Sequence, residues 1–219
     1  MTIKNSTLKS VKSASKSLAI FALVSSTLVA VTFALTEIRI AENERQALLK
    51  NLHELVPPQL HDNDLYTDNL VIDAPTLNYR GKSITVYRAR MKSKSAFAIF
   101  SVIAPDGYSG AIKLLIAINY NTESIAGVRV VNHKETPGLG DAIEIQKSNW
   151  IRVFDNTSLS KPTINKWSVK KDGGYFDQLT GATITPRAIV KITKKTLEYF
   201  SANKTRVFKL SDKHGTNKL

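Results

Sequence analysis

The chain has 219 residues, of which 42% are hydrophobic, enough for one folded domain and additional segments. It contains no cysteine, which excludes a thiolate-ligated iron–sulfur cluster, a zinc–thiolate site and a disulfide framework within this chain. The net charge of +13 is compatible with nucleic-acid binding, but four basic residues precede residue 17, five follow residue 203, and the others are scattered rather than clustered with aromatic residues. We therefore expect no nucleic-acid partner.

The first predicted element is an apolar segment at residues 17–36, which contains no charged residue, no proline and no glycine. At ~1.5 Å per residue, a helix of this length spans a ~30 Å hydrocarbon core. The preceding basic segment, residues 1–16, contains Lys4, Lys9, Lys12 and Lys16 and no acidic residue. The positive-inside rule places this segment in the cytoplasm and the rest of the chain across the membrane. A cleaved signal peptide is the alternative, but the apolar run exceeds the usual ~7–15 residues and no clean Ala-x-Ala site follows it.

Residues 37–58 are predicted to form a helix that links the membrane segment to the domain. Its apolar residues at helical spacing are Ala41, Leu48, Leu49, Leu52 and Leu55. Pro57-Pro58 ends this helix, because proline lacks the N–H group that a continuing helix needs. Residues 59–82 contain few long apolar runs, so we expect loops with short strands there.

Four segments with a β pattern follow. They are Ser83–Arg90, Ser95–Ala104, Ala111–Tyr120 and Ser124–Asn132. The second segment is almost continuously apolar, which favours burial on both faces. Pro105-Asp106-Gly107 is predicted to form the turn before the third strand, and Asn121-Thr122-Glu123 a short hairpin-like connection before the fourth.

Short helical elements complete the predicted domain. We expect one or two helical turns at Asp141–Lys147, a further short element at Trp150–Phe154 and a final helix at residues 186–201. Strands followed by helices, without regular βα alternation, indicate an α+β fold with a mixed, mostly antiparallel sheet and flanking helices. The domain is expected to span residues 59–202. A flexible basic tail at residues 203–219 would follow, either solvated or in contact with anionic lipid or a partner subunit.

The most unusual segment is Asp177–Thr183, which reads D-x-x-T-G-A-T and leads directly into the final helix. Its Gly-Ala pair predicts a thin, flexible turn that leaves the neighbouring threonine hydroxyl accessible, because glycine tolerates strained backbone conformations. Thr185 is a favoured N-cap residue and Pro186 a favoured first helical residue. That helix N-terminus would favour a negative charge placed on Thr183. Taken alone, the motif also fits an ordinary loop before a capped helix.

A second unusual segment is His133–Gly140, which lies between a predicted strand and a short helical pattern. Its glycines at 138 and 140 allow the backbone to approach a planar ligand or a phosphate closely. A tight turn between two elements is the alternative interpretation, because a lone Gly-x-Gly pattern is common.

Three motifs occur in the order and at roughly the spacing of a known family. They are Gly107-Tyr108-Ser109-Gly110, E-T-P-G-L-G at residues 135–140 and D-x-x-T-G-A-T at residues 177–183. With the membrane segment and the helix after it, they resemble the G subunit of the Rnf-type (Rsx) electron-transport complexes. This family is related to the C subunit of the sodium-pumping NADH:quinone reductases. The resemblance extends from the membrane segment to about residue 200.

The resemblance implies a covalent cofactor, FMN esterified through its phosphate to the hydroxyl of Thr183. It implies that the flavin transferase recognises the surrounding pattern, namely Asp177, Thr180, Gly181 and Ala182. Asp177 itself is no phosphate ligand, because both groups are anionic. The residues expected to pack near the isoalloxazine ring or the phosphate are Thr136, Gly138, Leu139 and Gly140, with Leu139 as an apolar contact and the backbone amides as donors.

Several aromatic and titratable residues have no assigned role at this point. His133 either hydrogen-bonds the flavin or is a structural or surface residue, and the role of Glu135 is open. Trp150 and Trp167 either stack near the ring or are core aromatics. No metal site is predicted, because His53, His61 and His214 show no ligand spacing.

The function implied by the resemblance is that of a membrane-anchored electron relay within a multi-subunit, ion-translocating oxidoreductase. The chain would not be catalytic alone. Its partners would be iron–sulfur, flavin and membrane subunits of the complex and a separate flavin transferase that loads FMN. The chain would lie in the bacterial inner membrane, with its N-terminus in the cytoplasm and its main domain in the periplasm.

Two other functions are alternatives to the relay. In the first, the chain is a non-redox, membrane-anchored interaction or assembly module, and Thr-Gly-Ala-Thr is only a loop. In the second, it is a free-standing flavin reductase, which would need an open substrate pocket, and no set of residues in the sequence suggests one.

Overall fold

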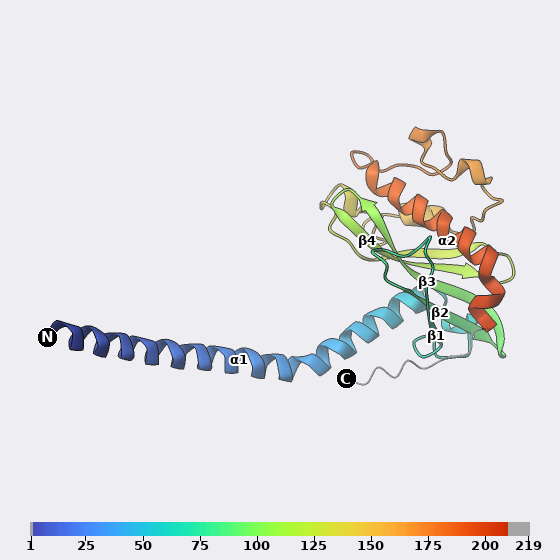
Figure 1. Cartoon of the computed structure of the whole chain (residues 1–219). Coiled ribbons are helices and arrows are strands. Elements are labelled where there is room, and N and C mark those ends of the chain that lie inside the picture. The colour runs from blue at the N-terminus through green and yellow to red at the C-terminus, as the bar shows by residue number, and fades with distance from the viewer. Residues whose placement is uncertain (1, 210–219) are drawn as a thin grey trace. The chain divides into compact units, whose positions relative to one another are not determined.

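The N-terminal part of the molecule is one long helix. The computed structural model describes residues 2–209, except for the side chains of residues 2–10 and 13. Helix α1 (Thr2–Leu55) runs without a break where the sequence predicts a membrane helix and a linker helix (Figure 1). Its stretch Ala14–Leu55 is long and apolar enough to cross a membrane, with a mean hydropathy of 2.3 in the most apolar window, none of which is buried. This stretch fits a single-pass membrane anchor.

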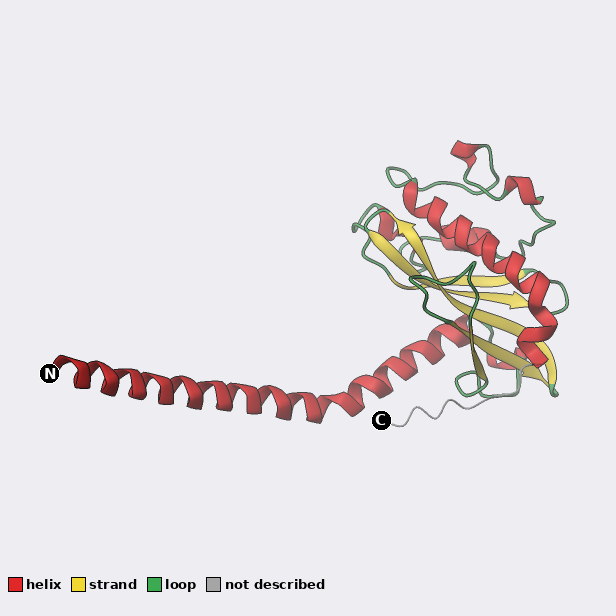
Figure 2. Cartoon of the chain, viewed as in Figure 1, coloured by secondary structure: helices red, strands yellow, loops and turns green. Residues whose placement is uncertain are grey.

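The folded domain, which begins after Leu48, is built on one five-stranded sheet. Its strands are β1 (Asn69–Ile72), β2 (Ile84–Met91), β3 (Lys94–Gly107), β4 (Gly110–Asn119) and β5 (Ile125–Asn132). They lie in the order β1-β2-β3-β4-β5, and each pair of neighbours is antiparallel (Figure 2). The α+β prediction is confirmed, and this sheet is antiparallel throughout.

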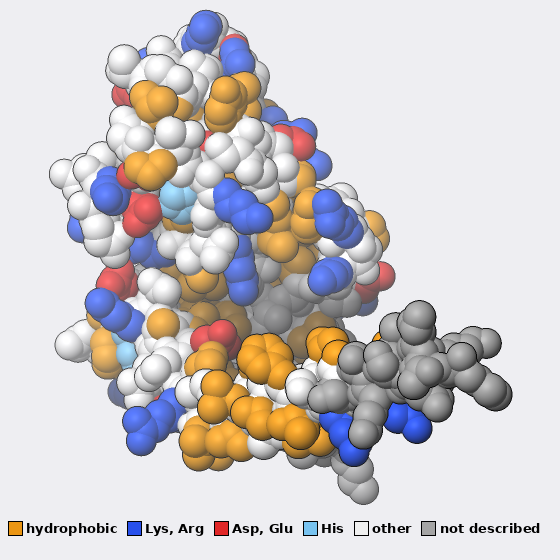
Figure 3. Space-filling view, turned by 90° about the vertical axis from the view of Figure 1, so that its left-hand side faces the viewer, with side chains coloured by type: hydrophobic (Ala, Val, Ile, Leu, Met, Phe, Trp, Pro, Cys, Tyr) orange, Lys and Arg blue, Asp and Glu red, His pale blue; other side chains and the backbone are white. Residues whose placement is uncertain are grey.

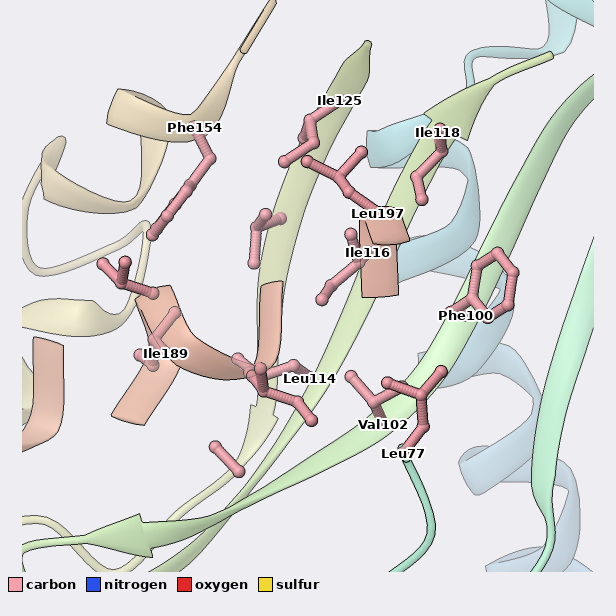
Figure 4. Close-up of a cluster of buried hydrophobic side chains, with 14 of the residues drawn as sticks. Leu77, Phe100, Val102, Leu114, Ile116, Ile118, Ile125, Phe154, Ile189 and Leu197 are labelled. Atoms are coloured by element: carbon pink, nitrogen blue, oxygen red, sulfur yellow. The ribbon is translucent and has the colours of Figure 1, made fainter. Parts of the chain in front are cut away.

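Helix α2 (Ile184–Lys209) lies across one face of the sheet and packs mainly on β3 and β4 (Figure 1). Side chains alternate between the faces of a strand, so the even-numbered residues of β3 and β4, such as Phe100 and Leu114, share one face. They form a buried hydrophobic cluster with Ile189 and Leu197 of α2 (Figure 4). The amphipathic pattern of α2 thus has its apolar stripe against the sheet.

The opposite face of the sheet is also covered. Leu52 and Leu55, in the last turns of α1, are buried, and the Leu55 side chain lies against Gly127 of β5. On β3, Phe97 and Ile99 are buried on this second face while Phe100 is buried on the first. The centre of β3 is therefore buried on both faces, as its continuous apolar run predicts.

The turn between β3 and β4 is not where the sequence predicts it. Residues 105–107 belong to β3, and the chain reverses at Tyr108-Ser109, with Gly107 paired to Gly110. The register shifts between Ala104 and Gly107, so a bulge absorbs the proline-containing stretch. Pairing with β4 outweighs the local turn preference of Pro-Asp-Gly. The Asn121–Glu123 connection does join β4 to β5, as predicted.

The final helix extends beyond the predicted residues 186–201 at both ends. It continues to Lys209, so the expected tail at 203–219 begins with helix, and residues 210–219 lie outside the described part of the chain. Val207 is buried, and the Phe208 ring packs edge-on against Tyr120 at 5.1 Å between centroids. These contacts between distant parts of the chain hold the last two turns in place.

Between β5 and α2 the chain forms loops and short 3-10 helices, η2 (Gly140–Ile143), η3 (Trp150–Phe154), η4 (Ile164–Lys166) and η5 (Lys170–Asp172) (Figure 2). Helix η3 matches a predicted element. The predicted helical turns at Asp141–Lys147 shorten to η2, which packs near α2 and η3. This loop region carries both of the unusual sequence motifs.

Asp155, directly after η3, is expected to weaken the fold at neutral pH. Its Oδ1 is buried with no hydrogen-bond partner among the described residues, and burial raises its pKa above the usual 3.8, against the attraction of Arg129 and Arg152. An acid with a raised folded pKa binds protons more tightly when folded, so stability falls as pH rises through that window. We predict that Asp155→Asn raises the urea midpoint at pH 7 but not at pH ~3, where both side chains are neutral. A lower midpoint at pH 7 would contradict this account.

Candidate functional site

The two unusual motifs, more than 35 residues apart in sequence, meet in space. A Cβ atom built on Gly181 would lie 3.3 Å from Cδ2 of Leu139, so the two loops are in van der Waals contact. The 136–140 loop follows β5 and leads into η2, while residues 177–183 lead into α2. The tertiary structure therefore brings the predicted Thr136–Gly140 and Asp177–Thr183 residues into one place.

The Asp177–Thr183 segment ends in a tight turn. Ala182 N–H donates a hydrogen bond of 3.1 Å to the carbonyl oxygen of Leu179, with Thr180 and Gly181 at the tip. Gly181 has φ +77°, in the left-handed region that glycine adopts at little cost. Thr180 is exposed, whereas Thr183 is partly buried where the turn meets the helix. The turn expected from the Gly-Ala pair is present.

Helix α2 begins at Ile184, two residues earlier than predicted, so Thr183 occupies the N-cap position. The helix follows directly, with Arg187 N–H donating to the Thr183 carbonyl at 3.3 Å. The assignment of Thr185 as N-cap is wrong, because its side chain is fully buried and its hydroxyl donates to Glu135. Pro186 is then the third helical residue, where a missing N–H still costs no intrahelical bond.

Glu135 lies at the centre of the site, although its role is open from the sequence. Its carboxylate is buried, with Oε2 accepting from the Thr185 hydroxyl at 2.6 Å and Oε1 accepting from Ser109 N–H at 3.0 Å. Gly140 packs directly against it, since a Cβ there would lie 2.6 Å from Oε2. Neither partner could be found from sequence, because they lie 26 and 50 residues away.

The Thr136–Gly140 loop satisfies its own backbone groups. Leu139 and Gly140 N–H both donate to the Thr136 carbonyl, at 3.2 and 3.1 Å, and Gly138 N–H donates to Asp141 Oδ1 at 2.8 Å. In this structure the amides of Gly138, Leu139 and Gly140 are thus engaged within the protein, and their role as donors to a ligand stays a prediction. The group that this loop presents outward is the Leu139 side chain, which is 48% exposed.

His133 is engaged within the protein through both ring nitrogens. Nδ1 accepts from Glu135 N–H at 2.9 Å, which leaves the ring proton on Nε2, 2.8 Å from Glu144 Oε1. This favours the structural interpretation of His133. Among residues 2–209, no group of three or more His, Asp or Glu residues could hold a metal ion. His53 and His61 stack on one another at 5.6 Å, and His214 lies outside the described residues.

The two tryptophans have different surroundings. Trp167 is buried and packs against Phe154 and Phe176, as a core aromatic does. Trp150 also packs on Phe154, but its Nε1–H donates to the Asp177 carbonyl at 2.7 Å. Trp150 thus ties the start of the Asp177–Thr183 segment to η3.

This tie gives a testable expectation. Trp150→Phe keeps an aromatic ring but removes the hydrogen bond from Nε1–H to the Asp177 carbonyl. We predict that the free energy of unfolding falls by about 1 kcal/mol and that amide hydrogen exchange across Asp177–Thr183 becomes faster. Trp167→Phe is the matched control, because it removes a similar bond from Nε1 to the Ser158 carbonyl, 3.1 Å away, outside this segment. Equal rates of amide hydrogen exchange across Asp177–Thr183 in the two variants would show that Trp150 does not hold this segment in place.

Charged residues near the segment are largely paired. Asp177 forms an ion pair with Lys170 at 2.7 Å, and both side chains are exposed. Arg187 binds Asp172 through two nitrogens at 2.6 Å, and this bond lowers the pKa of the Asp172 carboxyl. On the face shown in Figure 3, Lys and Arg side chains are spread among acidic and neutral ones rather than gathered in one basic patch.

Apolar side chains are exposed on both sides of Thr183. Leu139 touches the Gly181 turn, and Ile184, the next residue after Thr183, is 44% exposed. Tyr108, next to the Ser109 that binds Glu135, is 69% exposed. Exposed apolar groups beside a helix N-terminus suit a ligand that has a planar apolar part and an anionic part.

Comparisons with known proteins agree with this arrangement. Residues 107–198 match the family model of the FMN-binding domain, and residues 1–55 match that of the RnfG N-terminal region. The G subunit of the ion-translocating oxidoreductase complex of Pseudomonas aeruginosa (strain UCBPP-PA14) is 47% identical over 190 residues, covering 87% of this chain and 88% of that protein. The protein of the same name from Aliivibrio fischeri (strain MJ11) is 38% identical over 203 residues, 93% of this chain and 96% of that one.

A further relative and one solved structure extend the comparison. The corresponding G subunit of Pseudoalteromonas atlantica (strain T6c / ATCC BAA-1087) is 40% identical over 195 residues, 89% of this chain and 90% of that one. The crystal structure of Shewanella oneidensis NqrC has a TM-score of 0.45 and 19% identity, over 68% of this chain and 72% of that one. This similarity is too weak to support a conclusion. The sequence relatives are decisive by identity and coverage: the chain belongs to the family of G subunits of ion-translocating oxidoreductase complexes, and residues 107–198 are its FMN-binding domain.

Proposed function

We propose that this protein carries FMN as a phosphoester on Thr183 Oγ1 and relays electrons within its complex. The family assignment supplies the oxidoreductase complex and the FMN-binding domain, and the attachment residue is our own inference. The observation that carries it is the position of Thr183. This residue is the N-cap of α2, directly after the Gly181 turn and beside the loop that presents Leu139.

Thr180, Thr183 and Thr185 differ in what they offer a flavin transferase. Thr180 is exposed at the tip of the turn, away from the helix end. Thr185 is at the helix end, but it is fully buried and its hydroxyl is already donated to Glu135. Thr183 alone among them combines a partly exposed side chain with the N-terminus of α2, which makes it the best attachment point.

The surroundings of Thr183 fit the two chemically different parts of FMN. The N–H groups of Ile184 and Thr185 have no intrahelical acceptor, and the helix dipole favours negative charge, so a phosphodiester is stabilised there. The exposed side chains of Leu139 and Ile184 offer apolar surface for the ring. Bound FMN would supply one- and two-electron transfer, while these residues hold it in place.

The attachment implies a maturation partner and a location. A flavin transferase would recognise the Asp177–Thr183 pattern, whose Asp177 carboxylate is accessible at the surface. The basic residues before the apolar part of α1 favour a cytoplasmic N-terminus in the bacterial inner membrane, with the FMN-binding domain in the periplasm. Electrons would pass to and from flavin or iron–sulfur groups of other subunits, since this chain has no cysteine to hold a cluster.

The proposal is tested by the mass of the chain itself. The full-length chain is produced in membranes with a flavin transferase, purified, denatured and analysed by intact mass and by fluorescence of its gel band. We expect the mass of one esterified FMN and a fluorescent band. An unmodified mass and a dark band would refute the relay and leave the non-redox assembly module as the better function.

A further inference from the structure

We infer that Glu135 is a positioning residue of the flavin site, which fixes the start of α2 and sets a negative charge near the flavin. This inference rests on the proposed attachment to Thr183. The carboxylate of Glu135 accepts a hydrogen bond from Thr185, the residue two positions after Thr183 in the sequence.

Three separate segments converge on this one carboxylate. The β3–β4 turn donates through Ser109 N–H at 3.0 Å, and the first turn of α2 donates through the Thr185 hydroxyl at 2.6 Å. The third segment is the 136–140 loop, whose Gly140 leaves space for the carboxylate that any side chain would fill. Glu135 therefore links the β3–β4 turn and the 136–140 loop to the first turn of α2, and a change in its side chain should disturb these links.

The backbone of Glu135 is itself held firmly. Its N–H donates to His133 Nδ1 at 2.9 Å, and His133 Nε2 lies 2.8 Å from Glu144 Oε1. These bonds fix the point from which the Glu135 side chain projects. Because the backbone and both carboxylate oxygens of Glu135 are hydrogen-bonded, its side chain has little conformational freedom. A side chain held in this way can fix the position of the α2 N-terminus.

The charge of Glu135 matters as well as its shape. Both carboxylate oxygens accept a hydrogen bond, so neither is left without a partner in the buried site. Among the described residues, no lysine, arginine or histidine lies within ion-pair distance of it. The two donors, Ser109 N–H and the Thr185 hydroxyl, offset part of the cost of burying this carboxylate. Because a fixed negative charge opposes the arrival of electrons nearby, Glu135 is expected to lower the reduction potential of the flavin.

The test uses full-length chains loaded with FMN by the transferase in detergent or membranes. Glu135→Gln keeps the shape but removes the charge and one acceptor, and Thr185→Val removes the donor. Each is expected to slow FMN loading about tenfold, the effect of losing one hydrogen bond to a charged group. Thr185→Ser, which restores the hydroxyl, should recover loading. In the fraction that is loaded, Glu135→Gln should have a more positive midpoint potential than wild type, whereas Thr185→Val, which keeps the charge, should not.

A matched control contacts the same helix from the β4–β5 connection. Glu123 also accepts two side-chain hydrogen bonds from α2, from Ser201 at 2.8 Å and from Lys204 at 2.5 Å, but near its other end. Glu123→Gln should load and titrate as wild type does. If it behaves like Glu135→Gln, or if Glu135→Gln loads at the wild-type rate with an unchanged potential, the positioning role is wrong.

Comparison of Thr183→Val with Glu135→Gln distinguishes a wrong attachment residue from a wrong role for Glu135. If Thr183→Val still carries covalent FMN, the proposed attachment to Thr183 is wrong and the role of Glu135 fails with it. If Thr183→Val carries none while Glu135→Gln loads and titrates normally, the attachment stands and only the inference about Glu135 is refuted. Thermal unfolding of each variant shows whether reduced loading merely follows a loss of folded protein.

Discussion

Thr183→Val is expected to remove all covalent FMN from the chain and to leave the domain folded. Valine has the shape of threonine without the hydroxyl, so the ester cannot form. Thr183 is the N-cap residue of α2, and its backbone carbonyl, which accepts from Arg187 N–H at 3.3 Å, is unchanged in the variant. A change at an N-cap costs at most about 0.5–2 kcal/mol, so the helix should remain. The measurement is the fluorescence of the denatured gel band and the intact mass, with far-UV circular dichroism to show that the fold remains. Membranes with this variant should lose electron transfer through the complex.

The control for this variant is another N-cap threonine. Thr163 is the N-cap residue of η4, and its hydroxyl donates to Asn165 Oδ1 at 2.7 Å, a bond that Thr163→Val removes. It should keep its flavin in full, because η4 carries no part of the proposed site. Covalent flavin retained by Thr183→Val would move the attachment to another hydroxyl. Thr180 would then be the first to examine, since the Thr185 side chain is fully buried.

Phe100→Ala is expected to destabilise the domain by about 3–5 kcal/mol, the usual cost of removing a buried aromatic side chain. Phe100 is fully buried at the centre of β3 (Figure 4). Its ring packs edge-on against Tyr199 and Phe200 of α2, at 6.3 and 6.0 Å between ring centroids. The cavity would lie between the sheet and α2. Because domains are stable by only about 5–15 kcal/mol, this loss is a large share of the total. Urea unfolding followed by tryptophan fluorescence measures it.

The same measurement on an exposed aromatic residue gives the reference. Tyr108→Ala truncates a ring of similar size in the β3–β4 turn, where the side chain is 69% exposed, so its effect should stay within about 0.5 kcal/mol. Phe100→Leu, which fills part of the cavity, should fall between the two. Equal midpoints for Phe100→Ala and Tyr108→Ala would mean that α2 does not depend on this contact.

The elements of the fold were largely predictable because their signals are local. The apolar run in α1, the alternating or continuous apolar strands and the Pro186 region each lie within a short window of sequence. The exceptions arose where distant contacts overruled a local preference. Pro105–Gly107 is predicted as a turn but belongs to β3, with a bulge and with Gly107 paired to Gly110. Residues 203–209 are predicted as a polar tail but contain Val207 and Phe208, which pack against the domain.

The candidate site was predictable in composition but not in arrangement. The segments 136–140 and 177–183 stand out by their glycines and threonines. The family resemblance predicts that both contribute to one flavin site. The sequence could not show that Thr183, rather than Thr185, is the N-cap, because that depends on Glu135, 50 residues away. Nor could it show that the 136–140 amides are used within their own loop.

The sequence by itself therefore determined the class of protein, the membrane-type helix, the α+β domain and the segment that is proposed to bear the flavin. Periodicity, charge and composition act over a few residues, and they leave a readable pattern in the chain. Only the tertiary structure showed that Thr183 is the N-cap of α2, that the Thr185 hydroxyl donates to Glu135 and that this carboxylate is buried. Those properties arise when the β3–β4 turn, the loop after β5 and the start of α2 meet around Glu135, and no local pattern encodes contacts between segments so far apart.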